Sequence, residues 1–133
     1  MAETLRFALV SPERELYSGD VDQVDAPGVE GEFGVLPRHA PFMTTLKSGV
    51  VRIHEAGRIT PVFVRGGFAD VTPAGLTILA EEAVRIADVD AVQLDAQITN
   101  LRADATDPGD ESRRTRALER LQYLEALKAA LTA

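Results

Sequence analysis

Two pairs of carboxylates are the side chains whose types and spacing could most simply support acid and base chemistry. Glu30 with Glu32, and Asp20 with Asp22, stand two residues apart, which places both side chains of a pair on one face of a strand. Such a pair can act as general acid and base only where an apolar pocket keeps one carboxyl protonated. The neighbouring residues predict no such pocket, so we interpret both pairs as solvated strand faces.

The two imidazoles, His39 and His54, do not predict a metal site. Neither lies within metal-ligand spacing of another histidine or of a cysteine, which the chain lacks. The sequence also has no phosphate-binding loop, no dinucleotide-binding glycine fingerprint and no nucleophile elbow. The pair Gly66-Gly67 is better explained as a kink or bulge in a strand than as a phosphate cradle, because no helix start follows it. We expect no enzyme active site, no cofactor and no bound metal.

Residues 31–41, with the sequence GEFGVLPRHAP, constrain the backbone more than any other stretch. Glycine allows a positive φ or a close approach of two chain segments, and proline fixes φ and removes a hydrogen-bond donor. This combination predicts a strand or bulge that ends in a rigid loop, from which Glu32, Arg38 and His39 point outward. An ordinary surface corner with solvated charges is the alternative.

Short β-type runs with Gly- or Pro-containing turns between them occupy residues 5–83. Val51 and Ile53 alternate with Arg52 and His54, as in a strand with one buried face. Parallel sheets would need crossover helices, for which there is no room. The runs are 5–10, 15–17, 21–26, 32–36, 42–46, 50–54, 59–64, 68–71 and 76–80. They predict an antiparallel β-sandwich or flattened barrel of about ten strands.

Two helices are predicted after the strands. The first begins with Asp88 as candidate N-cap, and the second with Asp107 as cap and Pro108 at its first position. Exposed ion pairs are expected three residues apart, at Arg116 with Glu119 and at Glu125 with Lys128. The two apolar stripes consist of Leu94, Ile98, Leu101 and Ala105 and of Leu118, Leu121, Leu124, Leu127 and Leu131.

The predicted fold is α+β, with a β-sandwich over residues 1–87 and a helical hairpin over residues 88–133. Helices of about 16 and 22 residues with one modest stripe are marginal alone, so they must pack on each other or on something else. A stripe that can be satisfied in two places could form a switch. A permanently docked hairpin is the alternative.

Charge and hydropathy exclude several classes of partner. The formal net charge of −7 disfavours general attraction to nucleic acid or to anionic lipid. No run approaches the roughly 20 apolar residues that span a bilayer, so any membrane association is expected to be indirect. The first residues show no leader pattern, which favours a bacterial cytoplasmic setting. The last helix is locally basic.

The run GEFGVLPRHAP, the run LKSGVVRI at 46–53, the run GGFADV at 66–71 and the run LTILAEEA at 76–83 together resemble the epsilon chain of F-type ATP synthases. The match is specific from residue 7 to 83 and continues to residue 133 as a helical pattern. The resemblance implies a non-catalytic rotor subunit of the central stalk, which couples proton translocation through the c ring to ATP synthesis. It also implies a location on the cytoplasmic face of the bacterial inner membrane.

The resemblance carries specific contacts to positions in this chain. Glu32 and His39, with Arg38 beside them, match residues that contact the polar loops of the c-subunit ring. Ser11, Met43 and Val50 match positions that face the gamma subunit. The helices match an element that inhibits ATP hydrolysis by extending toward an acidic segment of the beta subunit, within the alpha and beta subunits of F1. The basic residues that suit this encounter are Arg113, Arg114, Arg116 and Arg120.

A nucleotide-binding motif of many family members is incomplete here. In residues 89–94, Asp90 matches, but Gln93 stands in place of the arginine and Leu94 in place of the alanine. An amide cannot supply the charge-assisted hydrogen bonds of a guanidinium to phosphate, so we predict weak or absent nucleotide binding.

The alternative to the rotor subunit is a free-standing β-sandwich module that binds a peptide or sugar. The absence of tryptophan and the presence of two tyrosines count against it.

Overall fold

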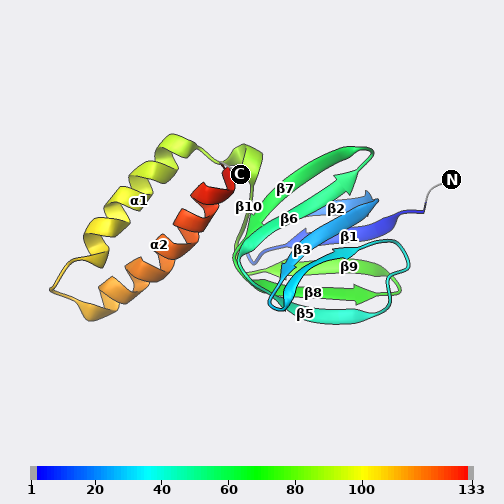
Figure 1. Ribbon diagram of the computed structural model, residues 1–133, viewed down its shortest axis with the longest axis horizontal. Coiled ribbons are helices and arrows are strands. Elements are labelled where there is room, and N and C mark those ends of the chain that lie inside the picture. Colours follow the sequence, from blue (N-terminus) through cyan, green and yellow to red (C-terminus); the bar gives the residue numbers. More distant parts are fainter. Residues whose placement is uncertain (1–2, 132–133) are drawn as a thin grey trace. The chain divides into compact units, whose positions relative to one another are not determined.

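The computed structural model describes residues 3–131 (Figure 1). The chain divides between Ala87 and Asp88 into two compact units. The described part of the first unit holds ten strands and a short 3-10 turn, and that of the second holds two helices. The predicted α+β class and the ten-strand sandwich are confirmed.

The strands of the first unit lie close to the predicted runs. Strand β2 extends to Val21, four residues beyond its predicted end, and the last short strand was not predicted as a separate run. The strands are β1 (Leu5–Val10), β2 (Glu15–Val21), β3 (Gln23–Gly28), β4 (Gly31–Val35), β5 (Phe42–Leu46), β6 (Gly49–Glu55), β7 (Arg58–Val64), β8 (Gly67–Thr72), β9 (Gly75–Ala80) and β10 (Ala83–Arg85).

Hydrogen bonds join all ten strands into one strongly curved sheet. Its order is β10-β7-β6-β3-β5-β8-β9-β1-β2, and β4 pairs with β3 off this path (Figure 1). Adjacent strands pair antiparallel, except β1 and β9, which are parallel from Phe7 with Leu76 to Val10 with Leu79. The expectation of a purely antiparallel sandwich is therefore wrong for this pair. The strands between β1 and β9 bring the chain back to the same end, so no crossover helix is required.

The sandwich is filled by the inward residues of alternating strands. In β1, Phe7 and Leu9 are fully buried, while in β6, Val51 and Ile53 are buried and alternate with half-buried polar residues. This confirms the predicted alternation. At the start of β8, Gly67 has a φ of 120°, and a Cβ added there would lie 2.1 Å from the carbonyl oxygen of Leu79. Only glycine fits this close approach.

The first helix begins later than predicted. Asp88 ends a 3-10 turn, η1 (Ile86–Asp88), and α1 spans Ala91–Ala105. Asp90 is the N-cap, because its Oδ1 accepts hydrogen bonds from the backbone N–H groups of Val92 at 3.0 Å and Gln93 at 3.1 Å. The choice of Asp88 as cap is therefore wrong, since that residue is used by the preceding turn.

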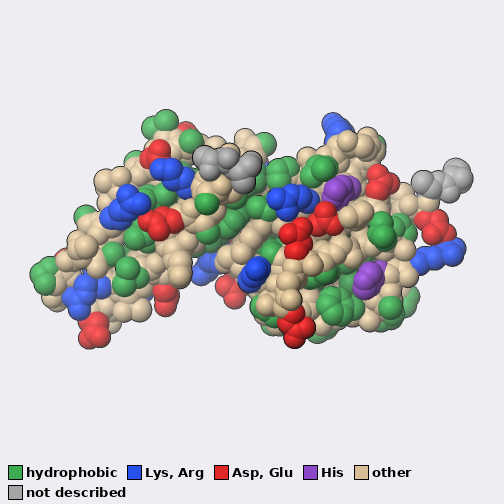
Figure 2. All heavy atoms as spheres, in the orientation of Figure 1, with side chains coloured by type: hydrophobic (Ala, Val, Ile, Leu, Met, Phe, Trp, Pro, Cys, Tyr) green, Lys and Arg blue, Asp and Glu red, His purple; other side chains and the backbone are tan. Residues whose placement is uncertain are grey.

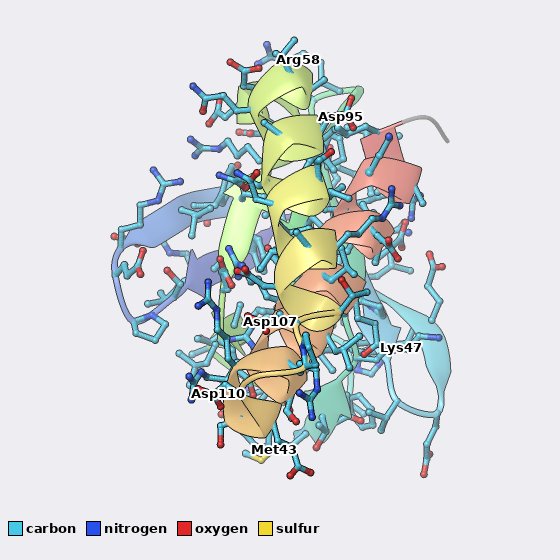
Figure 3. All side chains as sticks on the ribbon, turned by 90° about the vertical axis from the view of Figure 1, so that its left-hand side faces the viewer. Met43, Lys47, Arg58, Asp95, Asp107 and Asp110 are labelled. Atoms are coloured by element: carbon cyan, nitrogen blue, oxygen red, sulfur yellow. The ribbon has the colours of Figure 1, made fainter. Side chains whose placement is uncertain are left out.

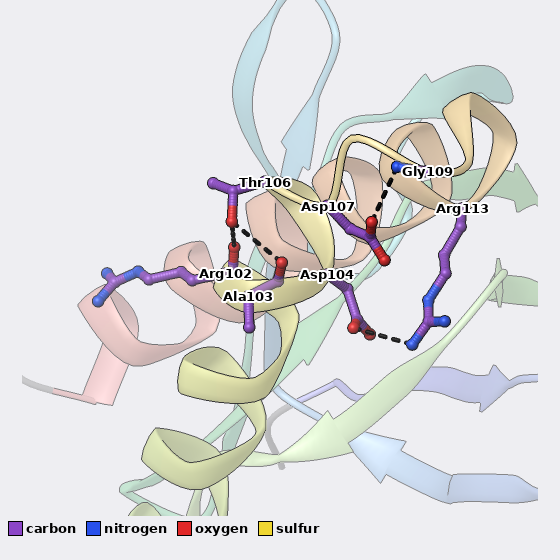
Figure 4. A network of polar contacts seen from close by, with 7 residues as sticks. All are labelled: Arg102, Ala103, Asp104, Thr106, Asp107, Gly109 and Arg113. Carbon is purple, nitrogen blue, oxygen red and sulfur yellow. Dashed lines mark hydrogen bonds and ion pairs between the residues drawn. The ribbon is translucent and has the colours of Figure 1, made fainter.

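The second helix, α2, spans Glu111–Leu131, so the prediction that Asp107 and Pro108 begin it is wrong. Asp110 Oδ1 accepts from the backbone N–H of Arg113 at 3.1 Å and fills the capping role. Asp107 instead accepts from the backbone N–H of Gly109 at 2.9 Å and closes the turn between the helices (Figures 3 and 4). Asp107 thus stabilises the turn between the helices, and Asp110 caps the N-terminus of α2.

The predicted stripes are confirmed at Leu94, Ile98, Leu124 and Leu127, which are buried, and are wrong at Leu118, which is exposed. Other members of the stripes, at positions 101, 105, 121 and 131, are half-buried. Ala117 and Tyr123, which were not assigned to the stripe, are buried as well. The buried line on α2 is therefore rotated relative to the prediction.

Three ion pairs connect α1 with α2 and show that the helices run antiparallel. Lys128 Nζ lies 2.7 Å from Asp95 Oδ1, and Arg102 lies 3.0 Å from Glu125. A third pair joins Arg113 to Asp104 at 3.0 Å (Figure 4). Glu125 and Lys128, which were expected to pair with each other, thus each pair with the facing helix. We refer to these three contacts as the interhelical ion pairs.

Candidate functional site

The loop after β4 is a tight turn with an unusual residue at its third position. His39 N donates to the carbonyl oxygen of Leu36 at 3.2 Å, which closes a four-residue turn with Pro37 second. Arg38, at the third position, has a φ of 64°. A turn with proline second and positive φ third usually has glycine at that third position. The predicted rigid loop is therefore present, with an arginine held in a conformation that favours glycine.

Arg38 and His39 lie together, and Glu32 lies apart from them. Arg38 forms an ion pair of 2.6 Å with Glu3, and the Nδ1 of His39 lies 2.8 Å from the carbonyl oxygen of Ala40. Glu32 stands near the other end of β4, where it lies 3.7 Å from Arg52 of β6. All three predicted side chains are exposed, so each is accessible to a partner.

Arg38 and His39 border a recess of about 480 Å³ at one end of the sandwich. Its other walls come from the start of β1, from the end of β2 at Asp20 and from the turn between β8 and β9 at Pro73. Arg6 and Asp20, 3.8 Å apart across β1 and β2, add a second exposed ion pair to its lining. The recess is therefore polar and carries both signs of charge.

Of the three residues predicted to face gamma, Met43 is the most exposed. Ser11 is buried, and its hydroxyl donates to the carbonyl oxygen of Arg14 at 3.3 Å. Val50 is half-buried on the outward face of β6. Met43, on β5, is 66% exposed. Met43 and Val50 lie on different strands and Ser11 lies just after β1, so the three residues do not form a single cluster.

Met43 belongs to an exposed apolar surface that was not predicted from the sequence. Phe68 on β8 is 53% exposed and Leu79 on β9 is 54% exposed. Phe68 is the Cα partner of Leu79, and Met43 lies diagonally across from Phe68 on β5. We call Met43, Phe68 and Leu79 the apolar patch. In Figure 2, hydrophobic side chains gather near the lower edge of the sandwich, where β5 and β8 lie. Ser11 borders the patch, because it follows the Cα partner of Leu79 on β1.

The second histidine belongs to a hydrogen-bonded cluster on the outward face of β3 and β6. His54 Nε2 lies 2.8 Å from Asp25 Oδ2, and Gln23 donates to the other oxygen of Asp25 at 2.6 Å. Of the carboxylates considered for catalysis, Asp22 accepts from the backbone N–H of Ala56 at 2.9 Å. His54 and Asp25 are thus paired between β6 and β3, and Asp22 is paired with the turn between β6 and β7.

Tyr17 of β2 has the clearest electrostatic perturbation. Burial, and then the 2.6 Å hydrogen bond that its hydroxyl donates to Glu55 of β6, raise the pKa of Tyr17 to about 12. A phenol held neutral by these contacts links β2 to β6. It is suited to bracing the sandwich.

Three of the four predicted basic residues of the hairpin make contacts within it. Arg113 pairs with Asp104, and Arg114 donates to the carbonyl oxygen of Asp107 at 2.9 Å. The guanidinium of Arg120 lies 5.0 Å from the ring centroid of Tyr123.

Asp90, the one match to the nucleotide motif, uses its Oδ1 to cap the N-terminus of α1. The prediction of weak or absent nucleotide binding stays a prediction.

Within residues 3–131, no group of three histidine, cysteine, aspartate or glutamate side chains is placed to hold a metal ion. Over the same residues, neither helix has the length and apolar character needed to cross a bilayer.

Comparison with known proteins places these features in a family. A family model described as "ATP synthase, Delta/Epsilon chain, beta-sandwich domain" matches residues 4–86. The "ATP synthase epsilon chain" of Hyphomonas neptunium is 56% identical over 134 residues, with 98% of each chain covered. That of Maricaulis maris is 50% identical over 129 residues, with 97% of each covered.

Solved structures give the same answer. A chain of the Euglena gracilis mitochondrial ATP synthase, in a structure of "OSCP/F1/c-ring", superposes with a TM-score of 0.79 at 27% identity. The match covers 96% of this chain and 81% of that one. A chain from the Tetrahymena thermophila mitochondrial ATP synthase central stalk and c ring shares the fold, with a TM-score of 0.61 at 14% identity and 97% of each chain covered. From sequence and fold together, this chain belongs to the ATP synthase delta/epsilon chain family.

Proposed function

We propose that this chain is a non-catalytic rotor subunit of an F-type ATP synthase, in which it helps to couple proton translocation through the c ring to ATP synthesis. The observation that carries the proposal is full-length similarity to proteins named ATP synthase epsilon chain, over both the sandwich and the hairpin. A match to a chain in an F1/c-ring assembly supports it. The family match gives no support to a free-standing module that binds a peptide or sugar.

The apolar patch is the proposed docking surface for gamma. Large exposed apolar side chains on three neighbouring strands are typical of a protein–protein contact. Met43, predicted to face gamma, is part of this patch, and Ser11 borders it. Val50 would contact gamma only if that subunit also reaches the outward face of β6.

The exposed end of the sandwich is the proposed contact with the c ring. Arg38 and His39 are exposed at this end, and Glu32 is exposed near the start of β4, so the proposed contact extends along that strand. The densely filled interior beneath them gives the rigidity that torque transmission requires. Association with the membrane would then be indirect, through the complex, on the cytoplasmic face of the inner membrane.

The hairpin is the proposed regulatory element. Separating the two helices breaks surface ion pairs of small energy, but it also exposes Leu94, Ile98 and Leu124, so these side chains would need a new apolar partner on F1. An extended α2 would be about 31 Å long at 1.5 Å per residue. Its arginines would face an acidic segment of the beta subunit. In this proposal, opening the hairpin frees Arg113 from Asp104 and makes its charge available for that contact.

Co-purification tests the docking proposal. A tagged chain expressed in its host is expected to recover the other synthase subunits from detergent-solubilised membranes. Phe68→Asp should abolish recovery without unfolding the sandwich, because the substitution puts a charge into the patch. Ile59→Asp is the matched control, since Ile59 of β7 is exposed to a similar degree outside the patch. Recovery that survives in Phe68→Asp, or that fails equally in both variants, would contradict the assigned surface.

Two further variants test the ring contact and the hairpin separately. Glu32→Lys should lower ATP-driven proton pumping of the reconstituted enzyme while the fold is kept.

Removal of residues 88–133 should raise the rate of ATP hydrolysis if the hairpin inhibits that reaction. Unchanged hydrolysis after this deletion would show that the helices have no inhibitory role here.

A further inference from the structure

We infer that Phe42 is a positioning residue that orients His39, so that the loop after β4 presents a hydrogen-bond acceptor to an N–H donor on the partner. The inference rests on the proposed c-ring contact for the identity of that partner. The orientation itself is a property of this chain alone. The two parts can therefore be tested apart.

The tautomer of His39 follows from its backbone contact. Its Nδ1 lies 2.8 Å from the carbonyl oxygen of Ala40. A carbonyl oxygen can only accept, so Nδ1 carries the proton. In the neutral ring, Nε2 then has a free lone pair and accepts a hydrogen bond.

A chain of ring contacts connects His39 to the interior of the sandwich. The ring of Phe42 lies 6.2 Å from that of His39, with an interplanar angle of 53°. Phe42 in turn meets Phe33 edge to face, with centroids 5.5 Å apart at 76°. Phe33 is partly buried and packs against the hydrophobic core. The exposed imidazole is thus braced, through two rings, on the most rigid part of the unit.

Phe42 lies at the edge of the core, next to the loop. It stands four residues from buried Leu46 on β5 and is the Cα partner of buried Val71, so its side chain is on the inward face of the strand. At the first position of β5 the ring is still 41% exposed. One ring thus contacts both Phe33, which packs on the core, and His39 on the loop.

The tautomer of His39 determines which partner group it can meet. Arg38 lies 2.6 Å from Glu3, but its side chain is 82% exposed and its guanidinium keeps further N–H donors. Glu32 lies apart from the loop, 3.7 Å from Arg52. The acceptor that the loop itself presents is therefore Nε2 of His39, and the partner should offer an amide or guanidinium N–H to it.

The orientation is tested by nitrogen NMR of the His39 ring in the full chain at alkaline pH. We expect one dominant Nδ1–H tautomer in the unmodified chain and a mixture in Phe42→Ala. Phe42→Tyr, which keeps the ring, should restore the single tautomer, and Phe68→Ala should leave it unchanged. Ring signals that are the same in Phe42→Ala and in the unmodified chain would overturn the inference, even if the rotor assignment is correct.

The partner is tested by proton pumping of the reconstituted enzyme. His39→Ala and Phe42→Ala should each reduce pumping, by up to about tenfold if one hydrogen bond of about 1.4 kcal/mol is lost. The double variant should be no worse than His39→Ala, and Phe42→Tyr should restore pumping. Additive losses would mean that Phe42 touches the partner itself and would overturn the positioning role. Normal pumping by His39→Ala would overturn the proposed contact and, with it, the partner assigned here.

Discussion

The sandwich and the hairpin are stabilised in different ways. The sandwich encloses fully buried side chains, among them Phe7, Leu9 and Ile78. The hairpin buries fewer side chains and adds three ion pairs on its surface, in which side chains such as Arg102 and Lys128 remain more than half exposed. Buried apolar packing gives a fixed structure, whereas exposed ion pairs each contribute about 0.2–1 kcal/mol and respond to salt. The sandwich is therefore expected to be rigid, and the hairpin to change its stability with solution conditions.

The largest test of this contrast compares one buried residue in each unit. Phe7→Ala should lower the free energy of unfolding of the sandwich by about 3–5 kcal/mol, because it removes a fully buried ring. Leu124→Ala should loosen the hairpin alone. The two tyrosines provide separate probes, since Tyr17 lies in the sandwich and Tyr123 in α2. Urea unfolding followed by tyrosine fluorescence is the measurement, with Tyr→Phe variants to assign each signal. Loss of both signals together in both variants would contradict independent stabilisation.

A second test uses salt. Raising the ionic strength from about 0.01 M to about 1 M shortens the screening length from about 30 Å to about 3 Å. The hairpin should lose about 1 kcal/mol of stability through its three ion pairs, and the sandwich should change little. Amide hydrogen exchange of residues 91–131 measures the effect. Arg102→Gln with Glu125→Gln, which removes one pair, should reduce the salt dependence. Equal acceleration of exchange in both units would mean that salt does not distinguish them.

A third test measures how much the hydrogen bond between Tyr17 and Glu55 contributes to the stability of the sandwich. Burial and the bond to Glu55 raise the pKa of Tyr17 from 10.0 to about 12. Between these values the unfolded chain loses its phenol proton while the folded chain keeps it, so stability should fall as pH rises from 10 to 12. Below pH 10 this contribution is fully present. Tyr17→Phe should flatten the decline seen in chemical unfolding over this range. An equally steep decline in the variant would assign the effect to other groups.

The smallest expected effect concerns a strained turn. Ala56 and Gly57 connect β6 to β7 with φ values of 53° and 81°, which is the pattern of a two-residue hairpin turn that prefers Asn-Gly. Ala56→Asn should therefore raise the stability of the sandwich by about 0.5–1 kcal/mol. Arg38→Gly should gain less, because it relieves similar strain but loses the ion pair with Glu3. Thermal unfolding measures both variants. A lower melting temperature for Ala56→Asn would refute the assignment of strain.

Strand positions and the α+β class could be predicted because alternation and turn residues are local signals. The apolar patch could not, because residues 76–80 read LTILA, with apolar side chains on both faces. Leu76 and Ile78 are buried, while Leu79 is exposed. Only the register with β8 shows that Leu79 meets Phe68 outside the core. An apolar residue at an outward position was the signal available in the sequence.

Helix details were misassigned for geometric reasons. Leu118 lies six residues before Leu124, which places it about 120° around the helix, whereas Ala117 lies seven residues before and is displaced by only about 20°. Leucines that stand three residues apart, as these do, therefore drift off the buried face of the helix. Asp107 and Asp110 both fit a cap in sequence, and only the path of the turn selects between them. The assignment of Arg38 and His39 as contact residues comes from the family resemblance, because turn residues predict that a side chain is exposed but not what it contacts.

The parallel pairing of β1 with β9 has a consequence for biosynthesis. One edge of β1 can pair with β2 as soon as both leave the ribosome, but the other edge waits for residues 76–79. At roughly 5–20 residues per second, this delay lasts several seconds. Throughout that interval the nascent chain carries an open strand edge beside unburied Phe7 and Leu9, which can pair with the strand of another chain. The last strands of the sandwich therefore act as the closing step of its folding.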